Sequence, residues 1–269
     1  MKAVFSPACL GYSFPGHPES PERVRRIRDA LKAAGYGFVA AGPASEKDVL
    51  LAHAREHLGR VRSGSYSDPD TPPLGIRFPL AAAGVAIKAA QVLGFALTRP
   101  PGHHAGRDFL GGFCYFNNIA IAVRKLGRRT AILDLDVHHG NGTQDIFLGD
   151  DKVLYVSLHQ VPHYPGTGLR SEGNCLNFPL PPGTAESAYL KALGKALGSV
   201  AHFKPEVLAV SMGFDTYAGD PLGGMRITAG GYGTIGAMVG GLGLPTFAVL
   251  EGGYSEKTGE LCLGFLEGF

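Results

Sequence analysis

Carboxylates and imidazoles gather in one short segment of the chain, Asp134-Leu135-Asp136-Val137-His138-His139. The segment follows the apolar run Thr130-Ala131-Ile132-Leu133, which is typical of a buried strand. Asp136 and His138 are two residues apart, so on an extended strand both side chains point to the same face. A carboxylate and an imidazole on a common face can ligate a borderline metal such as zinc. The segment therefore predicts part of a metal site at the end of a strand.

Other apolar runs also end in residues that can do chemistry. These residues are His103, His104, Asp215 and Tyr254. Ligands bind at the carboxyl ends of the strands in an open parallel sheet, so we expect all of these side chains to meet at one edge. Asp136, His138 and Asp215 would then form a three-ligand metal site with positions left for water and substrate, as a catalytic zinc requires.

Strand-like and helix-like segments alternate along the chain. The patterns predict strands over 3–5, 94–98, 130–135, 153–158, 207–212 and 245–250, and helices over 21–34, 46–60, 81–93, 117–126, 185–201 and 228–240. Nearly all-apolar strands between helices predict an α/β fold, with a parallel sheet covered on both faces. Residues 63–79 predict a long loop, which in a compact domain is usually functional. No shift in composition marks a boundary, so we expect one domain over 1–269.

Charge and composition exclude several classes of protein. A net charge of +2 and a pI of about 8.3 are too mild to predict a nucleic-acid surface. The densest basic run, residues 22–28, is interleaved with apolar residues and is interpreted as the solvated face of an amphipathic helix. The four scattered cysteines include no CxxC pair, which favours a reducing compartment. The sequence shows no signal-peptide core and no apolar window near ~20 residues, so we expect a cytoplasmic protein without a membrane span.

Seven sequence strings occur in a fixed order between Gly16 and Ser255: RPPGHHA, GGFCYFNN, DLDVHHGNGTQ, YVSLH, YPGTG, MGFDTYAGDPLGG and EGGYS. Together they resemble the histone deacetylase family, and within it the class II-like bacterial members, which include acetylpolyamine amidohydrolases and acetoin-utilisation-type proteins. The resemblance implies the arginase/deacetylase fold, with a central parallel sheet of about eight strands. The chain is short for this family, and we expect a terminal helix of the family to be trimmed.

The resemblance implies a role for each residue of the predicted site. Asp136, His138 and Asp215 match the metal ligands, whereas His103 and His104 match the tandem general base and general acid. Tyr254 matches the donor to the polarised carbonyl. Asp134 and Asn141 match the groups hydrogen-bonded behind the first and the second histidine.

The substrate-binding residues are implied in the same way. Phe113 and Tyr164 match the aromatic walls of an acyl-lysine tunnel, and the Gly112 carbonyl matches the acceptor of the substrate amide. Leu222 stands where polyamine-specific relatives can carry an acidic residue, and Asp70 is a candidate for the substrate-gripping aspartate of the rim. A structural K⁺ or Na⁺ site is implied for Asp134, Asp136, His138, Ser157 and Leu158.

The two histidines have chemically different partners. Asp134 should orient His103 and raise its basicity, whereas the neutral Asn141 should leave His104 less basic and easier to keep as a free base. The asymmetry favours His104 as the general base, although the sequence leaves the assignment open.

The remaining histidines and Cys114 are expected to be structural. His139 is interpreted as a structural residue and Cys114 as a packed thiol without an activating base. The others are interpreted as surface or hydrogen-bonded residues rather than metal ligands: His17, His53, His57, His159, His163 and His202.

These features predict a zinc-dependent amidohydrolase that removes acetyl or other acyl groups from lysine or a similar amine. Acetylpolyamine deacetylation is the alternative, and a two-metal ureohydrolase or a non-catalytic acyl-lysine binder is less favoured. Two carboxylates and an imidazole suit Fe²⁺ as well as Zn²⁺, so the metal stays open. The sequence also leaves open the acyl length, the oligomeric state and the role of the loop 63–79.

Overall fold

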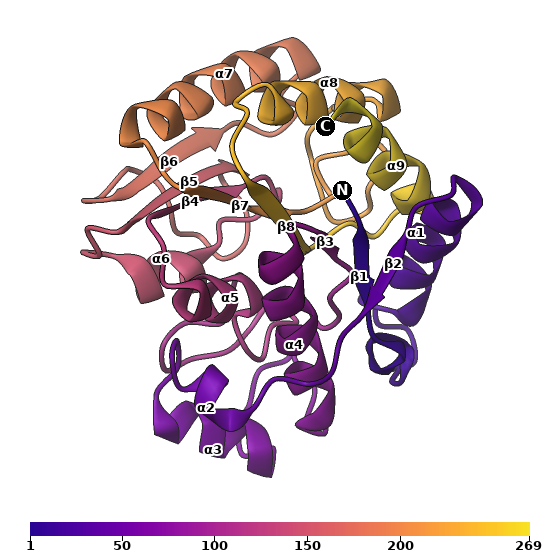
Figure 1. The fold of residues 1–269 in the computed structure, drawn as a ribbon, viewed down its shortest axis with the longest axis vertical. Helices are drawn as coiled ribbons and strands as arrows, with labels where there is room; N and C mark the ends of the chain where they lie inside the picture. The colour runs from indigo at the N-terminus through magenta and orange to yellow at the C-terminus, as the bar shows by residue number, and fades with distance from the viewer.

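The computed structural model describes all residues, 1–269, as alternating strands and helices (Figure 1). The strands are β1 (Ala3–Phe5), β2 (Phe38–Ala40), β3 (Phe95–Ala96), β4 (Thr130–Asp134), β5 (Val153–Gln160), β6 (Cys175–Leu180), β7 (Val207–Met212) and β8 (Thr246–Leu250). The helices are α1 (Pro21–Ala33), α2 (Glu46–Val49), α3 (Arg55–Ser63), α4 (Arg77–Val92), α5 (Asn118–Leu126), α6 (Asn141–Phe147), α7 (Glu186–Phe203), α8 (Ala229–Gly240) and α9 (Thr258–Gly268), and a short 3₁₀ helix covers Pro7–Leu10.

All eight strands belong to one sheet, in the order β2-β1-β3-β8-β7-β4-β5-β6. Every neighbouring pair is parallel. The predicted α/β class and the expected eight-stranded sheet are therefore confirmed. Because all strands run in the same direction, the loops that follow them gather at one edge of the sheet, which we call the carboxyl edge.

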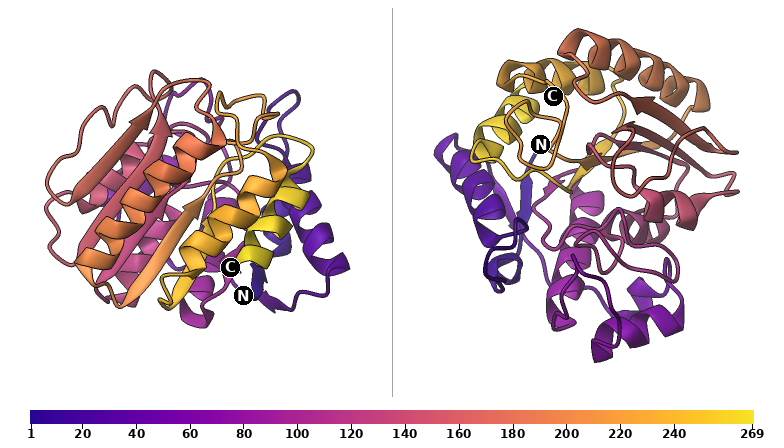
Figure 2. Two further views of the ribbon diagram at one scale, coloured as in Figure 1. Left: turned by 90° about the horizontal axis from the view of Figure 1, so that it is seen from above. Right: turned by 180° about the vertical axis from the view of Figure 1, so that it is seen from behind.

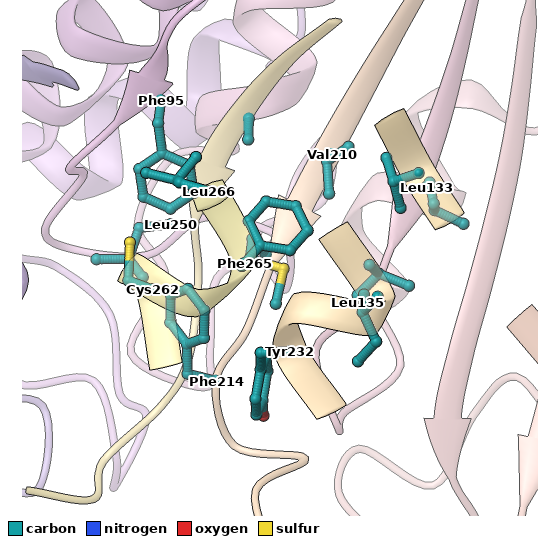
Figure 3. Packing of buried hydrophobic residues seen from close by; sticks show 14 of the residues in the cluster. Phe95, Leu133, Leu135, Val210, Phe214, Tyr232, Leu250, Cys262, Phe265 and Leu266 are labelled. Atoms are coloured by element: carbon teal, nitrogen blue, oxygen red, sulfur yellow. The ribbon is translucent and has the colours of Figure 1, made fainter. Parts of the chain in front are cut away.

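The sheet is buried on both faces because successive strand residues point to opposite sides. In β4, Leu133 belongs to one hydrophobic cluster and Ile132 to the other. Helices α1, α7, α8 and α9 cover the first face, and α4, α5 and α6 lie on the second (Figures 1 and 2). Figure 3 shows the first cluster, where Phe265 of α9 and Tyr232 of α8 lie among strand residues. Each fully buried large apolar side chain contributes ~1.5–3 kcal/mol to this packing.

Several predicted boundaries were wrong. The helical stretch 46–60 is divided into α2 and α3, and a capping box between Ser45 and Asp48 fixes the start of α2. The predicted strand 94–98 is reduced to Phe95–Ala96, and the loop over 63–79 is shorter because α4 begins at Arg77.

The elements β2, β6, α6 and α9 were not predicted. Strand β6 carries Pro179, which argues against a strand in sequence but is tolerated here because β6 lies at the edge of the sheet. Strand β4 ends at Asp134, so Asp136 and His138 lie in a turn and not on an extended strand. None of the helices has both the length and the apolar character needed to span a membrane.

Candidate active site

A buried carboxylate anchors the segment that carries the tandem histidines. Glu251, directly after β8, accepts hydrogen bonds from the backbone N–H groups of Gly102 (2.7 Å) and His103 (3.1 Å). Its other oxygen accepts a bond from the Ser211 hydroxyl at 3.1 Å. Burial raises the pKa of Glu251 to about 7. The loop after β3, the end of strand β7 and the loop after β8 are thus joined through one side chain, for which the sequence carried no separate prediction.

The two histidines lie side by side at the carboxyl edge and face different partners. His103 Nδ1 lies 3.1 Å from Asp134 Oδ2, and His104 Nδ1 lies 2.8 Å from Asn141 Oδ1. Their ring centroids are 4.0 Å apart, and both side chains are buried. Asp134 also accepts a bond from the Tyr155 hydroxyl at 2.9 Å. Because each Nδ1 can donate to its partner, each ring keeps Nε2 for other chemistry.

The surroundings of His103 and His104 give the two imidazole rings different proton affinities. Burial opposes charge on His103, but Asp136 and Asp134 outweigh it and raise the pKa of His103 to about 10. Burial, followed by the neighbouring His103 and His138, holds the pKa of His104 well below its usual value. Both directions agree with the prediction, but for His104 the cause is burial and the neighbouring histidines and not Asn141.

Asp136, His138 and Asp215 converge beside the histidines. Each offers one ligand atom, and these atoms all lie within 4.8 Å of one another. His138 Nδ1 lies 2.9 Å from Asp136 Oδ1 and 3.4 Å from Asp215 Oδ2. Two loops hold the carboxylates in place, since Gly252 N–H donates to Asp136 Oδ2 at 2.7 Å and Val137 N–H donates to Asp215 Oδ1 at 2.9 Å.

This cluster fits a divalent cation. Asp215 Oδ2 is buried and accepts no hydrogen bond, which is costly for a carboxylate oxygen. Burial and the adjacent Asp136 raise the pKa of Asp215 to about 7, because two carboxylates share one water-excluded space. A cation bound by Asp136, His138 and Asp215 would relieve both costs, and an imidazole with two carboxylates suits Zn²⁺ or Fe²⁺.

A cavity of about 330 Å³ opens above the three clustered groups. Its lining residues are His17, Pro18, Asp70, Pro101, His103, His104, Gly112, Phe113, His138, His163, Tyr164, Leu222, Gly252 and Tyr254. The cavity therefore contains the tandem histidines, one member of the metal cluster and every residue predicted to bind substrate.

The walls of the cavity depend on two unusual backbone positions. Gly112 has φ +53°, and a Cβ there would lie 2.5 Å from His104 Cδ2 and 2.9 Å from Tyr164 Cε1, so only glycine fits. Phe113 follows with φ +70°, and its N–H donates to Thr71 Oγ1 at 3.0 Å. The Tyr164 ring meets the His104 ring edge-on at 5.0 Å. Phe113 and Tyr164 thus flank the entrance to the histidines.

Tyr254 also lines the cavity, where its ring meets the Phe113 ring edge-on at 5.8 Å, and Arg23 packs against it. The Arg23 guanidinium lies 4.5 Å from the centre of the Tyr254 ring and donates to the carbonyls of Gly253 and Glu251 at 2.6 and 2.5 Å. Burial holds the pKa of Tyr254 well above its usual value, so the hydroxyl keeps its proton.

The prediction that the basic run forms a solvated helix face was wrong for Arg23, which is 1% exposed. The sequence carries a signal for this position. Arg23 shares a helix face with the buried residues Ile27 and Leu31, at spacings of four residues. It also contacts Glu19 at 3.2 Å, and Glu19 contacts the equally buried Arg99 at 2.7 Å.

Two histidines contribute to the cavity in a way that the sequence did not indicate. His163 stacks on His138 with ring centroids 4.6 Å apart and bonds to the Leu222 carbonyl at 2.9 Å. His17 bonds to the Asp70 carbonyl at 3.2 Å and meets the Phe113 ring at 4.7 Å. Both are hydrogen-bonded as expected, but both also line the cavity.

The remaining predicted residues lie near the site or below it. His139 is buried and bonds to Thr167 and Gln144, and the Cys114 thiol, whose pKa burial holds well above its usual value, is also buried. Ser157 lies beside Asp134 in the register of β4 and β5, and Leu158 follows it. Asp134, Ser157 and Leu158, which are expected to contribute to a monovalent cation site, are thus neighbours on strands β4 and β5.

Comparisons with known proteins agree with this architecture. The family model of the histone deacetylase domain matches residues 17–265. A probable deacetylase of Archaeoglobus fulgidus is 40% identical, over 90% of this chain and 78% of the relative. An acetylpolyamine aminohydrolase structure from Burkholderia pseudomallei is similar with a TM-score of 0.89 and 30% identity, over 100% of this chain and 98% of that chain. The structure of the HD domain of HDA15 has a TM-score of 0.91 and 33% identity, over 98% of this chain and 86% of that chain.

Proposed function

This chain belongs to the histone deacetylase family, and we propose that it is a metal-dependent amidohydrolase that removes acetyl or similar acyl groups from lysine side chains or comparable amines. One observation carries the proposal. A single cavity is lined by two histidines with different partners, by His138 of the three-residue group able to hold a metal ion, and by Tyr254. Hydrolysis of an unactivated amide requires water activation, oxyanion stabilisation and protonation of the leaving amine, and this set of residues can supply all three.

Asp136, His138 and Asp215 would hold the divalent ion, which supplies Lewis acidity to the amide carbonyl and the attacking water. His104, whose pKa burial holds well below its usual value and whose Nδ1 is engaged with Asn141, would take a proton from the water through its free Nε2. His103, held by Asp134, would donate a proton to the nitrogen of the leaving amine. The Tyr254 hydroxyl would donate to the carbonyl oxygen as negative charge develops there, an effect typically worth about 3–4 kcal/mol.

The substrate is proposed to enter between Phe113 and Tyr164, where a narrow aliphatic chain would lie between two rings. Gly112 would accept a hydrogen bond from the amide through its carbonyl, and Asp70 would contact the substrate at the rim. We also propose that Asp134, Asp136, His138, Ser157 and Leu158 bind K⁺ or Na⁺ below the site, because Ser157 and Asp134 are paired across neighbouring strands.

Two residues of the cavity favour different amine substrates. Leu222 lines the cavity without a charge, which favours acyl-lysine or another apolar amide over an acetylpolyamine. Asp70 lines the same cavity without a basic partner and would attract a second ammonium group, as a polyamine provides. We favour acyl-lysine, because Leu222 stands where polyamine-specific relatives can carry the acidic residue.

A two-metal ureohydrolase is disfavoured because the structure contains one group of residues able to hold a metal ion. A non-catalytic acyl-lysine binder would not need the paired histidines or Tyr254 in the cavity. A metal stoichiometry of one divalent ion per chain would separate the first of these alternatives from the deacetylase.

The test is turnover of an acetyl-lysine peptide by the zinc-loaded protein. We expect turnover that is lost on chelation, restored by zinc, and reduced about 10²–10³-fold in kcat by Tyr254→Phe, because one oxyanion donor is removed. Tyr36→Phe removes a hydroxyl of the same type outside the cavity and should leave kcat unchanged. Turnover that survives chelation or Tyr254→Phe would contradict the proposal, and a clear preference for acetylspermidine would move the substrate to polyamines.

A further inference from the structure

One carboxylate in the loop between β7 and α8 accepts hydrogen bonds from two walls of the cavity. Asp220 Oδ2 accepts the backbone N–H groups of Tyr254 (2.6 Å) and Ser255 (3.0 Å). Asp220 Oδ1 accepts the backbone N–H of Leu222 at 3.0 Å. The residue is 6% exposed and forms no ion pair, so its carboxylate is committed to these three N–H groups.

These bonds join loops that the sequence separates by a strand and a helix. Tyr254 and Ser255 follow β8, whereas Leu222 follows β7, and Tyr254 and Leu222 both line the cavity. The backbone of Tyr254 has no regular partner in the sheet, because β8 ends at Leu250. Asp220 is therefore the side chain that holds the backbone of Tyr254 in relation to the cavity wall.

We propose that Asp220 is a positioning residue for Tyr254 and, through Leu222, for the adjacent wall of the substrate cavity. The inference rests on the proposed function, because it assigns Tyr254 the donor role in that reaction. An oxyanion donor must meet the developing charge at hydrogen-bond distance, and a displacement near 1 Å can cost ~10²-fold in rate. Asp220 acts at the peptide N–H and does not itself need to touch the substrate.

The decisive variant is Asp220→Ala, which removes all three acceptor bonds. We expect kcat on the acetyl-lysine peptide to fall by about 30–100-fold with KM changed less than about threefold, because the lost positioning affects the transition state more than ground-state binding. In the Tyr254→Phe background the same substitution should lower kcat by less than about threefold, because the hydroxyl that Asp220 positions is already gone. Multiplicative losses would indicate a general structural role and would overturn the proposal.

A second readout does not require turnover. Backbone amide hydrogen exchange over residues 251–257 should become at least about tenfold faster in Asp220→Ala, whereas exchange in β7 should not change. If Asp220→Ala does not fold, Asp220→Glu takes its place, since it keeps the charge but displaces both oxygens by one methylene. Unchanged kcat together with unchanged exchange, in whichever variant folds, would overturn the proposal.

Asp150→Ala is the matched control. Asp150 also accepts a backbone N–H, that of Lys152 at 2.9 Å, but it lies at the other edge of the sheet, before β5. Asp150→Ala should lower the Tm without changing kcat. If the wild-type protein shows no turnover, the proposed function fails, while the exchange experiment still tests whether Asp220 holds the Tyr254 backbone.

Discussion

The two edges of the sheet differ in how deeply their charged side chains are buried. At the carboxyl edge, charged side chains are buried together, and Glu19, Arg23, Asp136, Asp215 and Glu251 are each at most 2% exposed. At the amino edge, where the strands begin, the connections are short and the charged side chains are more exposed. The pair Arg128–Glu206, just before β4 and β7, has side chains that are 48% and 54% exposed.

The difference shows at which edge of the sheet the folding free energy must offset the cost of burying charged side chains. Charges at the carboxyl edge lose hydration, so each needs a compensating partner, and burial can move the pKa of such a group far from its usual range. Asp215 and Glu251 illustrate this, because burial raises the pKa of each to about 7. Ion pairs at the amino edge remain hydrated and contribute little. The most costly buried charges of this fold therefore lie at the carboxyl edge.

The largest expected effect is the removal of one buried charge. Arg23→Leu should lower the free energy of unfolding by about 3–5 kcal/mol, because two buried carbonyl groups lose their donor and Glu19 loses one of its two buried arginine partners. Urea unfolding at pH 7 measures this loss. Arg25→Leu, on the exposed face of the same helix, is the control and should cost less than about 1 kcal/mol. Equal losses in the two variants would remove the distinction between the buried and exposed arginines.

An intermediate effect is expected from the buried pair His53 and His57, whose rings stack at 4.8 Å. Burial, with a smaller contribution from His57, lowers the pKa of His53 to about 3, and its ring nitrogens bond to Gly106 and Asn117. The folded state thus binds the proton more weakly than the unfolded chain. Stability is complete above pH ~6.5 and falls as the pH drops toward about 3, with a loss from His53 of about 2 kcal/mol at pH 5.

His53→Gln tests this titration, since glutamine offers a donor and an acceptor but does not titrate. Urea unfolding at pH 7 and pH 5 should show a smaller loss of stability in His53→Gln than in the wild type. The exposed His202→Gln should behave like the wild type. An identical pH dependence in all three proteins would show that His53 is not a source of acid sensitivity.

The smallest effect is expected at the amino edge. Arg128→Gln breaks the 2.8 Å contact with Glu206 and should change the free energy of unfolding by no more than about 1 kcal/mol, with the difference reduced in high salt. Thermal unfolding at low and high salt measures it. A loss as large as that of Arg23→Leu would contradict the expectation that an exposed ion pair contributes less to stability than a buried one.

The sequence was informative wherever a residue's role follows from a local pattern. Nearly all-apolar runs predicted the strands β4, β5, β7 and β8 to within a few residues, because a strand buried on both faces is composed mostly of apolar residues. Asp136, His138, Asp215 and the tandem histidines could be proposed as neighbours because parallel strands end at one edge. The short strand Phe38–Ala40 carries too few residues for a pattern, and the strand at Phe95–Ala96 was predicted with bounds that were too wide.

The sequence alone thus determined the α/β class and the residue types that gather at the carboxyl edge, because both follow from apolar periodicity and from the polarity of strands in a parallel sheet. Only the tertiary structure decided the partners. It placed Arg23 behind Tyr254, Glu251 beneath His103, and Asp220 between Tyr254 and Leu222. Arg23 also donates to the Gly253 carbonyl, which lies 230 positions away in the sequence. A buried charge takes its partner from whatever the packed chain brings within hydrogen-bond distance, and no local pattern records that choice.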